Sequence, residues 1–123
     1  MREREAELLR IKLDELMRIS PRVLVMGDFN CDLDERLHGD LKGLGFANAM
    51  EAAGGGVQLT MDTVGVGRWR IDHIYISSTL AAGLRRAHVV RSAGFRHDGP
   101  QVSGLWAHSD HLPVVAELAI GAA

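Results

Sequence analysis

The sequence predicts a mixed α/β (α+β) fold in a single domain, and three patterns support that prediction. Apolar residues recur at helical spacing from about residue 3 to residue 19, which indicates an amphipathic helix. The short apolar run at 22–26 is typical of a strand that is covered on both faces. The run at 113–118 is typical of a final strand that begins at a proline. A chain of 123 residues fits one domain with one modest core.

The remaining elements follow in chain order. Ser20 and Pro21 end the first helix, because proline disfavours helical geometry at the residue before it. A short helix is expected at 39–44, with Gly45 as the residue that ends it in a left-handed conformation. Residues 69–76 alternate as one strand, with His73 and Tyr75 on one side and Asp72 on the other. Another strand is expected at 84–90, and the glycine-rich stretch 92–107 is expected to form a long loop.

Composition and charge describe an ordinary soluble protein. Apolar residues make up 46% of the chain, charged residues 24%, and the net charge is −2, so no global basic field indicates nucleic-acid binding. Cys31 is the only cysteine, which excludes an intramolecular disulfide. No signal peptide and no apolar run of about 20 residues is present, so we expect a cytoplasmic protein without a membrane span.

Polar residues gather at three places beside the predicted strands. Asp28 follows a strand and a glycine, and suits a general base or a metal ligand in a polar loop. Asn30 offers an amide that could stabilise negative charge on oxygen, and Asp72 could orient a histidine by hydrogen bonding one ring nitrogen. Asp110 and His111 are adjacent and precede the last strand. Carboxylates with a single histidine favour Mg²⁺ or Mn²⁺ over zinc.

These clusters carry a resemblance to a known family. GDFN at 27–30, RIDHI at 70–74 and SDHLPV at 109–114 resemble, in order, the last three motifs of the endonuclease/exonuclease/phosphatase (DNase I-like) superfamily. The resemblance implies the C-terminal half of a four-layer α/β/β/α sandwich with mainly antiparallel sheets. In full members the N-terminal half supplies a glutamate that binds the metal, and nothing in residues 1–21 resembles it. The resemblance therefore implies that residues 1–123 form a single partial domain.

The resemblance also implies a role for each motif residue. Asp28 matches the aspartate that activates the attacking water and contributes to the metal site, and Asn30 matches the asparagine that binds the phosphoryl oxygen. His111 matches the histidine that contacts the scissile phosphate, and Asp72 matches the aspartate that orients it. Asp110 matches a neighbouring metal ligand. The implied activity is Mg²⁺- or Mn²⁺-dependent hydrolysis of a phosphoester in a nucleic acid, a phosphorylated small molecule or a lipid.

Alternatives remain open at this point. The chain could be a non-catalytic, homo-oligomeric interaction module or a truncated fragment of the family, or a complementing N-terminal half could complete it. Arg68 and Arg70 flank Trp69, which fits either a phosphate-binding patch or a solvated hairpin edge. His73 is expected to be a half-buried strand residue, and no role is assigned to His38.

Overall fold

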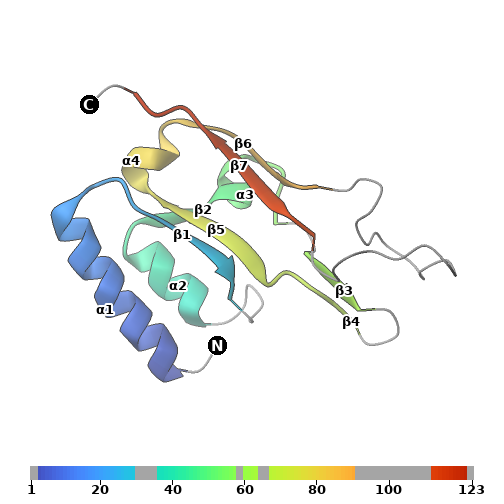
Figure 1. The fold of residues 1–123 in the computed structure, drawn as a ribbon, viewed down its shortest axis with the longest axis horizontal. Helices are drawn as coiled ribbons and strands as arrows, with labels where there is room; N and C mark the ends of the chain where they lie inside the picture. Colours follow the sequence, from blue (N-terminus) through green and yellow to red (C-terminus); the bar gives the residue numbers. More distant parts are fainter. Residues whose placement is uncertain (1–2, 30–35, 58–59, 64–66, 91–111, 122–123) are drawn as a thin grey trace, which may run out of the picture.

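The computed structural model describes residues 3–29, 36–57, 60–63, 67–90 and 112–121, and for 61–63 and 67–69 it describes the backbone. Helices are interspersed among the strands along this part of the chain (Figure 1). The elements are α1 (Glu3–Ile19), β1 (Leu24–Asp28), α2 (Arg36–Gly43), β2 (Phe46–Asn48), α3 (Ala49–Ala52), β3 (Met61–Thr63), β4 (Gly67–Trp69), β5 (Asp72–Ser77), α4 (Ser78–Ala81), β6 (Leu84–Val89) and β7 (Val114–Leu118). The predicted mixture of helices and antiparallel strands is confirmed.

The first helix has the predicted bounds and the predicted amphipathic character. Leu13 is buried, and Ala6, Leu9 and Met17 pack against the same core cluster. On the opposite side, the half-exposed Asp14 accepts a hydrogen bond from the guanidinium of Arg18, one turn further along. Burial of the apolar side of α1 against the rest of the protein therefore fixes the helix. No helix in the described ranges is long and apolar enough to cross a membrane.

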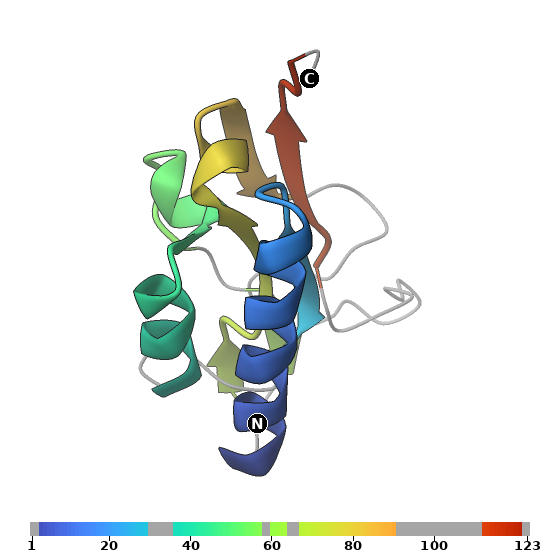
Figure 2. The same cartoon turned by 90° about the vertical axis from the view of Figure 1, so that its left-hand side faces the viewer.

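The central sheet has the strand order β1-β5-β2, and both pairings are antiparallel. Its middle strand, β5, alternates as predicted. Tyr75 packs with α1 and α2 in one core cluster, whereas Ile74 and Ile76 belong to a second cluster on the other face. Figures 1 and 2 show α1 and α2 on one side of this sheet and β7 toward the other. The described part of the chain therefore has a helical layer, a sheet layer and a second β layer.

The second β layer is the antiparallel pair of β6 and β7, which we call the β6–β7 ribbon. Val114, Ala116 and Leu118 of β7 pack against the second core cluster. The turn before β6 needs a glycine, because a Cβ at Gly83 would lie 2.0 Å from the carbonyl oxygen of Ala119. The predicted strands at 84–90 and 113–118 are confirmed by β6 and β7. The long loop predicted at 92–107 lies outside the described residues.

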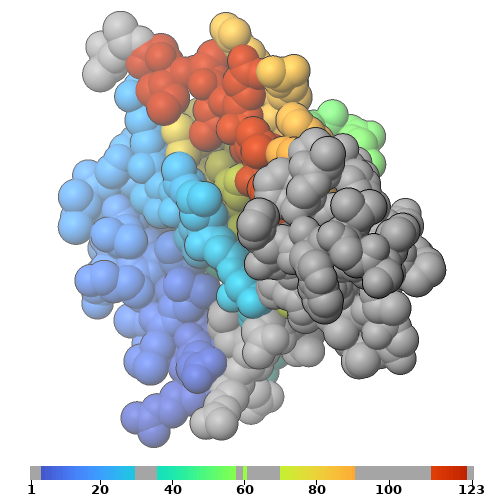
Figure 3. Space-filling view, turned by 45° about the vertical axis from the view of Figure 1, so that its right-hand side comes forward, coloured from blue at the N-terminus to red at the C-terminus, as the bar shows by residue number. Residues whose placement is uncertain are grey.

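The prediction for β1 was wrong in two respects. The strand does not stop at Gly27 but continues to Asp28, since both residues pair with β5. It is also not covered on both faces: the side chains of Leu24 and Met26 are 46% and 63% exposed. The β6–β7 ribbon packs against the central strand β5, whereas β1 is an edge strand. Figure 3 shows β1, in cyan, at the surface of the molecule.

The predicted single strand at 69–76 is two strands. Residues 67–69 pair with β3, residues 72–77 pair with β1, and Arg70 and Ile71 separate the two strands. The predicted helix at 39–44 begins earlier, at Arg36, and ends as expected before Gly45, whose φ is +92°. The sequence pattern did not reveal β2, α3, β3 or α4. Each of these elements has only three or four residues, which is too short for a periodic signal.

Candidate active site

Two of the predicted site residues lie side by side on neighbouring strands of the sheet. Asp28 is the last residue of β1 and Asp72 is the first residue of β5, and the two are direct partners in the antiparallel register. Side chains directly opposite each other share one face of the sheet, with Cβ atoms about 5 Å apart. Asp28 is exposed and Asp72 is half-buried. Asp28 therefore lies at a strand end rather than in the polar loop that was predicted.

The other three predicted residues fall outside the described part of the chain. Asn30, Asp110 and His111 belong to the ranges 30–35 and 91–111. Leu112, the next residue in sequence after His111, is described. It is buried, and its N–H donates to the carbonyl oxygen of Thr60 at 2.6 Å.

Thr60 is the residue through which two of the three motifs are connected. Its side chain is fully buried, and its hydroxyl oxygen accepts from the N–H groups of Ile71 and Asp72, each at 3.1 Å. The GDFN motif joins the same segment, because the N–H of Phe29 donates to the carbonyl oxygen of Ile71 at 2.8 Å. Together with the bond from Leu112, these contacts bring the GDFN and RIDHI motifs and the residue after His111 to one end of the sheet.

The carboxylate oxygens at this end of the sheet suit a hard divalent cation as ligands. Two carboxylates directly opposite each other in a sheet repel, and a cation or hydrogen-bond donors offset that repulsion. Mg²⁺ is commonly held by one or two carboxylates together with water and substrate phosphate. In the described ranges no group of three or more His, Cys, Asp or Glu side chains is placed to hold a metal ion. Asp28 and Asp72 thus fit a site that depends on further oxygen ligands.

A buried polar network that was not predicted lies directly behind this site. His73 was expected to be half-buried, but it is only 1% exposed. Its Nε2 lies 2.7 Å from the carbonyl oxygen of Arg70, and its Nδ1 lies 3.1 Å from the side-chain nitrogen of Asn48. The Asn48 oxygen accepts from the N–H of Met50 and so caps α3. A sequence signal existed for this cap, since Asn48 and Glu51 have capping-box spacing.

Aromatic rings surround His73 on the helical side of the sheet. The centroid of the Phe29 ring lies 5.5 Å from that of His73, and the ring of His38 meets His73 edge-on at 4.7 Å. His38 is 3% exposed and hydrogen-bonds the hydroxyl of Tyr75. Leu37, His38 and Leu41 share the buried side of α2. Phe29, inside the GDFN motif, is therefore anchored in the core while Asp28 stays at the surface.

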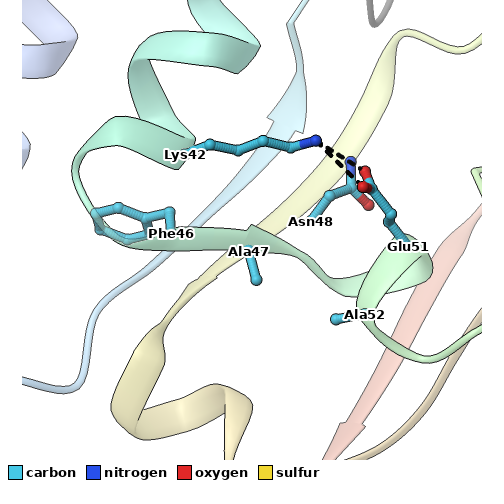
Figure 4. A pocket seen from close by; sticks show the side chains of 6 residues that line it. All are labelled: Lys42, Phe46, Ala47, Asn48, Glu51 and Ala52. Atoms are coloured by element: carbon cyan, nitrogen blue, oxygen red, sulfur yellow. Dashed lines mark hydrogen bonds and ion pairs between the residues drawn. The ribbon is translucent and has the colours of Figure 1, made fainter.

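A separate pocket lies along the opposite edge of the sheet (Figure 4). It is lined by Lys42, Phe46, Ala47, Asn48, Glu51 and Ala52. The ammonium group of Lys42 contacts the Glu51 carboxylate at 3.2 Å beside Asn48. The pocket belongs to β2 and its flanking helices, whereas the carboxylate pair lies between β1 and β5. None of its lining residues is a predicted site residue, so we do not assign the chemistry to it.

The fold is similar to two solved structures of NExo. One is the 3′ phosphatase NExo from Neisseria bound to a product DNA hairpin, with 22% identity and a TM-score of 0.68 over 94% of this chain. The other is the 3′-5′ exonuclease NExo from Neisseria meningitidis, with 24% identity and a TM-score of 0.67 over 92% of this chain. In both cases the chain spans 50% of the length of the solved protein. No curated protein matches the chain.

A family model for the Endonuclease/Exonuclease/phosphatase family also matches the sequence. It matches residues 1–111, which include the GDFN and RIDHI motifs and the start of the third motif. The structure adds that those two motifs meet at one end of the β1–β5 pair, through the Asp28–Asp72 register and the bond from Phe29 to Ile71. The chain belongs to the Endonuclease/Exonuclease/phosphatase family, whose members hydrolyse phosphoester bonds.

Proposed function

We propose that this chain carries part of the active site of a Mg²⁺- or Mn²⁺-dependent phosphoester hydrolase. The observation that supports the proposal best is the direct pairing of Asp28 with Asp72, each at a strand end. The buried hydroxyl of Thr60 holds the backbone of the second motif in place. A pair of carboxylates held this rigidly suits general-base catalysis, which needs its groups within hydrogen-bonding reach of the reacting atoms.

The proposed reaction is attack of water on phosphorus, which forms a bond to the water oxygen and breaks the bond from phosphorus to the ester oxygen that leaves. Each motif residue has a distinct role. Asp28 takes the proton from the attacking water, and Asn30 donates a hydrogen bond to the phosphoryl oxygen as its negative charge grows. His111 contacts the scissile phosphate, and Asp72 orients the His111 ring through one ring nitrogen. Asp110 and Asp28 are the residues that would hold the divalent ion. When bound, that ion supplies neutralisation of the charge that develops on the phosphate.

DNA 3′ ends are the first substrates to test. Both NExo structures are described by activities on phosphoester bonds, one as a 3′ phosphatase with a DNA hairpin and one as a 3′-5′ exonuclease. The same core residues suit other phosphoesters equally well, because fold does not determine substrate. A short 3′-phosphorylated DNA and a generic phosphodiester together separate a phosphatase from a phosphodiesterase.

The first test is hydrolysis of these substrates by the purified chain with Mg²⁺, with Mn²⁺ and with a chelator, beside His111→Ala. We expect turnover that requires the metal and that falls by about two to four orders of magnitude in the variant. Equal turnover in His111→Ala and the parent, or turnover that resists the chelator, would refute the proposal.

We further propose that a complementing half of the same fold packs on the exposed side of β1. Leu24 and Met26 are exposed there, and the chain spans half the length of the solved structures. The partner we favour is a complementing half of the same fold, which would cover these side chains and supply further metal ligands. Apolar side chains clustered on one face of an edge strand favour association.

The mass of the chain in solution, with and without such a half, tests this proposal. Mixing the two is expected to give a heterodimer, and Leu24→Glu is expected to weaken it by about tenfold or more. Leu8→Glu is the matched control, because Leu8 is also exposed, at 58%, but lies on α1. A stable homodimer, or a monomer that ignores the complementing half, would show that this partner is wrong.

A further inference from the structure

His73 is held at both ring nitrogens, and its partners define its protonation. A carbonyl oxygen can only accept, so the contact with Arg70 requires a hydrogen on Nε2. The Asn48 oxygen accepts from Met50, so the Asn48 nitrogen is the donor toward Nδ1. Nδ1 therefore carries no hydrogen. The neutral Nε2–H tautomer is the form that satisfies both bonds, and the assignment rests on the partners.

The bond to Arg70 acts on the short segment that separates β4 from β5. Arg70 precedes Asp72 by two residues, and neither Arg70 nor Ile71 belongs to a strand, although the Ile71 carbonyl accepts from the N–H of Phe29. The His73 ring binds the carbonyl of Arg70. The Thr60 hydroxyl binds the N–H groups of Ile71 and Asp72. Buried backbone groups without such partners would each cost free energy. The conformation that sets the position of Asp72 thus depends on two side chains, Thr60 and His73.

We propose that His73 is a positioning residue for Asp72. Through Nε2 it fixes the carbonyl of Arg70 and hence the start of β5, and through Nδ1 it ties that point to Asn48 at the beginning of α3. The rings of Phe29 and His38 restrict rotation of the imidazole. The catalytic meaning of the proposal rests on the proposed hydrolase function, but the positioning itself is a structural property that can be measured separately.

Two conservative variants distinguish the two ends of the imidazole. His73→Gln keeps an N–H donor at about the reach of Nε2, and so preserves the bond to the Arg70 carbonyl. His73→Asn keeps an acceptor near Nδ1, and so preserves the bond to Asn48 alone. His73→Phe keeps a ring in the aromatic cluster but preserves neither bond. If the Arg70 bond positions Asp72, then His73→Gln is the one variant of the three that keeps the segment before β5 as it is in the parent.

Backbone amide hydrogen exchange in the full chain gives a readout that does not require activity. The amides of Phe29 and Asp72 report on the segment, and the amide of Ala119, which donates to the Gly83 carbonyl, is a remote control. In His73→Phe and His73→Asn we expect exchange at Phe29 and Asp72 to accelerate about tenfold, with Ala119 unchanged. In His73→Gln we expect it to stay within about threefold of the parent. Long-range imidazole NMR of the parent is expected to show the Nε2–H tautomer.

Three results would overturn the proposal. They are no change at Phe29 and Asp72 in His73→Phe, an equal acceleration that includes Ala119, or failure of His73→Gln to rescue. Hydrolysis separates this proposal from the functional one. Where the parent turns over substrate, kcat is expected to fall in the variants whose exchange accelerates, His73→Phe and His73→Asn. KM is expected to stay within about twofold. A parent without turnover but with the expected exchange pattern would remove the hydrolase proposal and keep the positioning role.

Discussion

Replacing Asp28 by asparagine is expected to lower metal-dependent phosphoester hydrolysis by about 10² to 10⁴, the usual contribution of a general base. The same change is expected to leave the free energy of unfolding unchanged or to raise it by up to about 1 kcal/mol. The reason is that Asp28 is the register partner of Asp72, so the substitution removes one of two like charges on neighbouring strands while it keeps the shape of the side chain. Initial rates at saturating metal and denaturant unfolding of the same preparation measure the two effects.

The opposite signs of these two effects make the prediction specific. Asp14→Asn is the matched control, because Asp14 is a half-exposed carboxylate on α1 whose contact with Arg18 is an exposed ion pair. That variant is expected to lose about 0.3–0.5 kcal/mol of stability and no activity. If Asp28→Asn retains full hydrolysis, Asp28 is not the base. If it unfolds the protein by several kcal/mol, the carboxylate is a structural group instead.

The sequence predicted best those elements whose own pattern determines them. The helix α1 has its predicted bounds, because apolar side chains at helical spacing cover one side and Pro21 prevents continuation. The end of β1 was placed too early, since the apolar run stops at Met26 whereas pairing with β5 carries the strand on to Asp28. Pairing partners distant in sequence determine such ends, and a local pattern does not contain them.

The same limit explains why the candidate site was predicted only in part. The motif residues were identifiable because aspartate and asparagine stand beside strand ends. The contacts that support them were not, since Thr60 and His73 reach the segment at Arg70 and Ile71 through the fold. The alternation at 69–76 continues through that segment, so the break between two strands has no local signal. Asn48 was identifiable as a cap, but its second bond, to His73, was not.

Thr60 gives the prediction with the largest effect on stability. Its hydroxyl oxygen is fully buried and accepts from two N–H groups, those of Ile71 and Asp72. Thr60→Val keeps the size of the side chain but leaves both N–H groups without this acceptor. The expected loss is roughly 2 to 4 kcal/mol, because each unsatisfied buried group costs about 1 to 3 kcal/mol. Denaturant unfolding, with unchanged slope as evidence of the same two states, is the measurement.

Thr60→Ser is the matched control, since serine keeps the hydroxyl and loses one methyl group, at a cost of about 1 kcal/mol. Valine and serine variants of equal stability would show that packing, not the hydroxyl, is what matters at Thr60. A double variant tests whether Thr60 and His73 act on the same segment. Because Thr60 and His73 hold the same segment, Thr60→Val and His73→Phe are expected to be non-additive by about 0.5 to 3 kcal/mol. Simple additivity would mean that the two side chains support Asp72 independently.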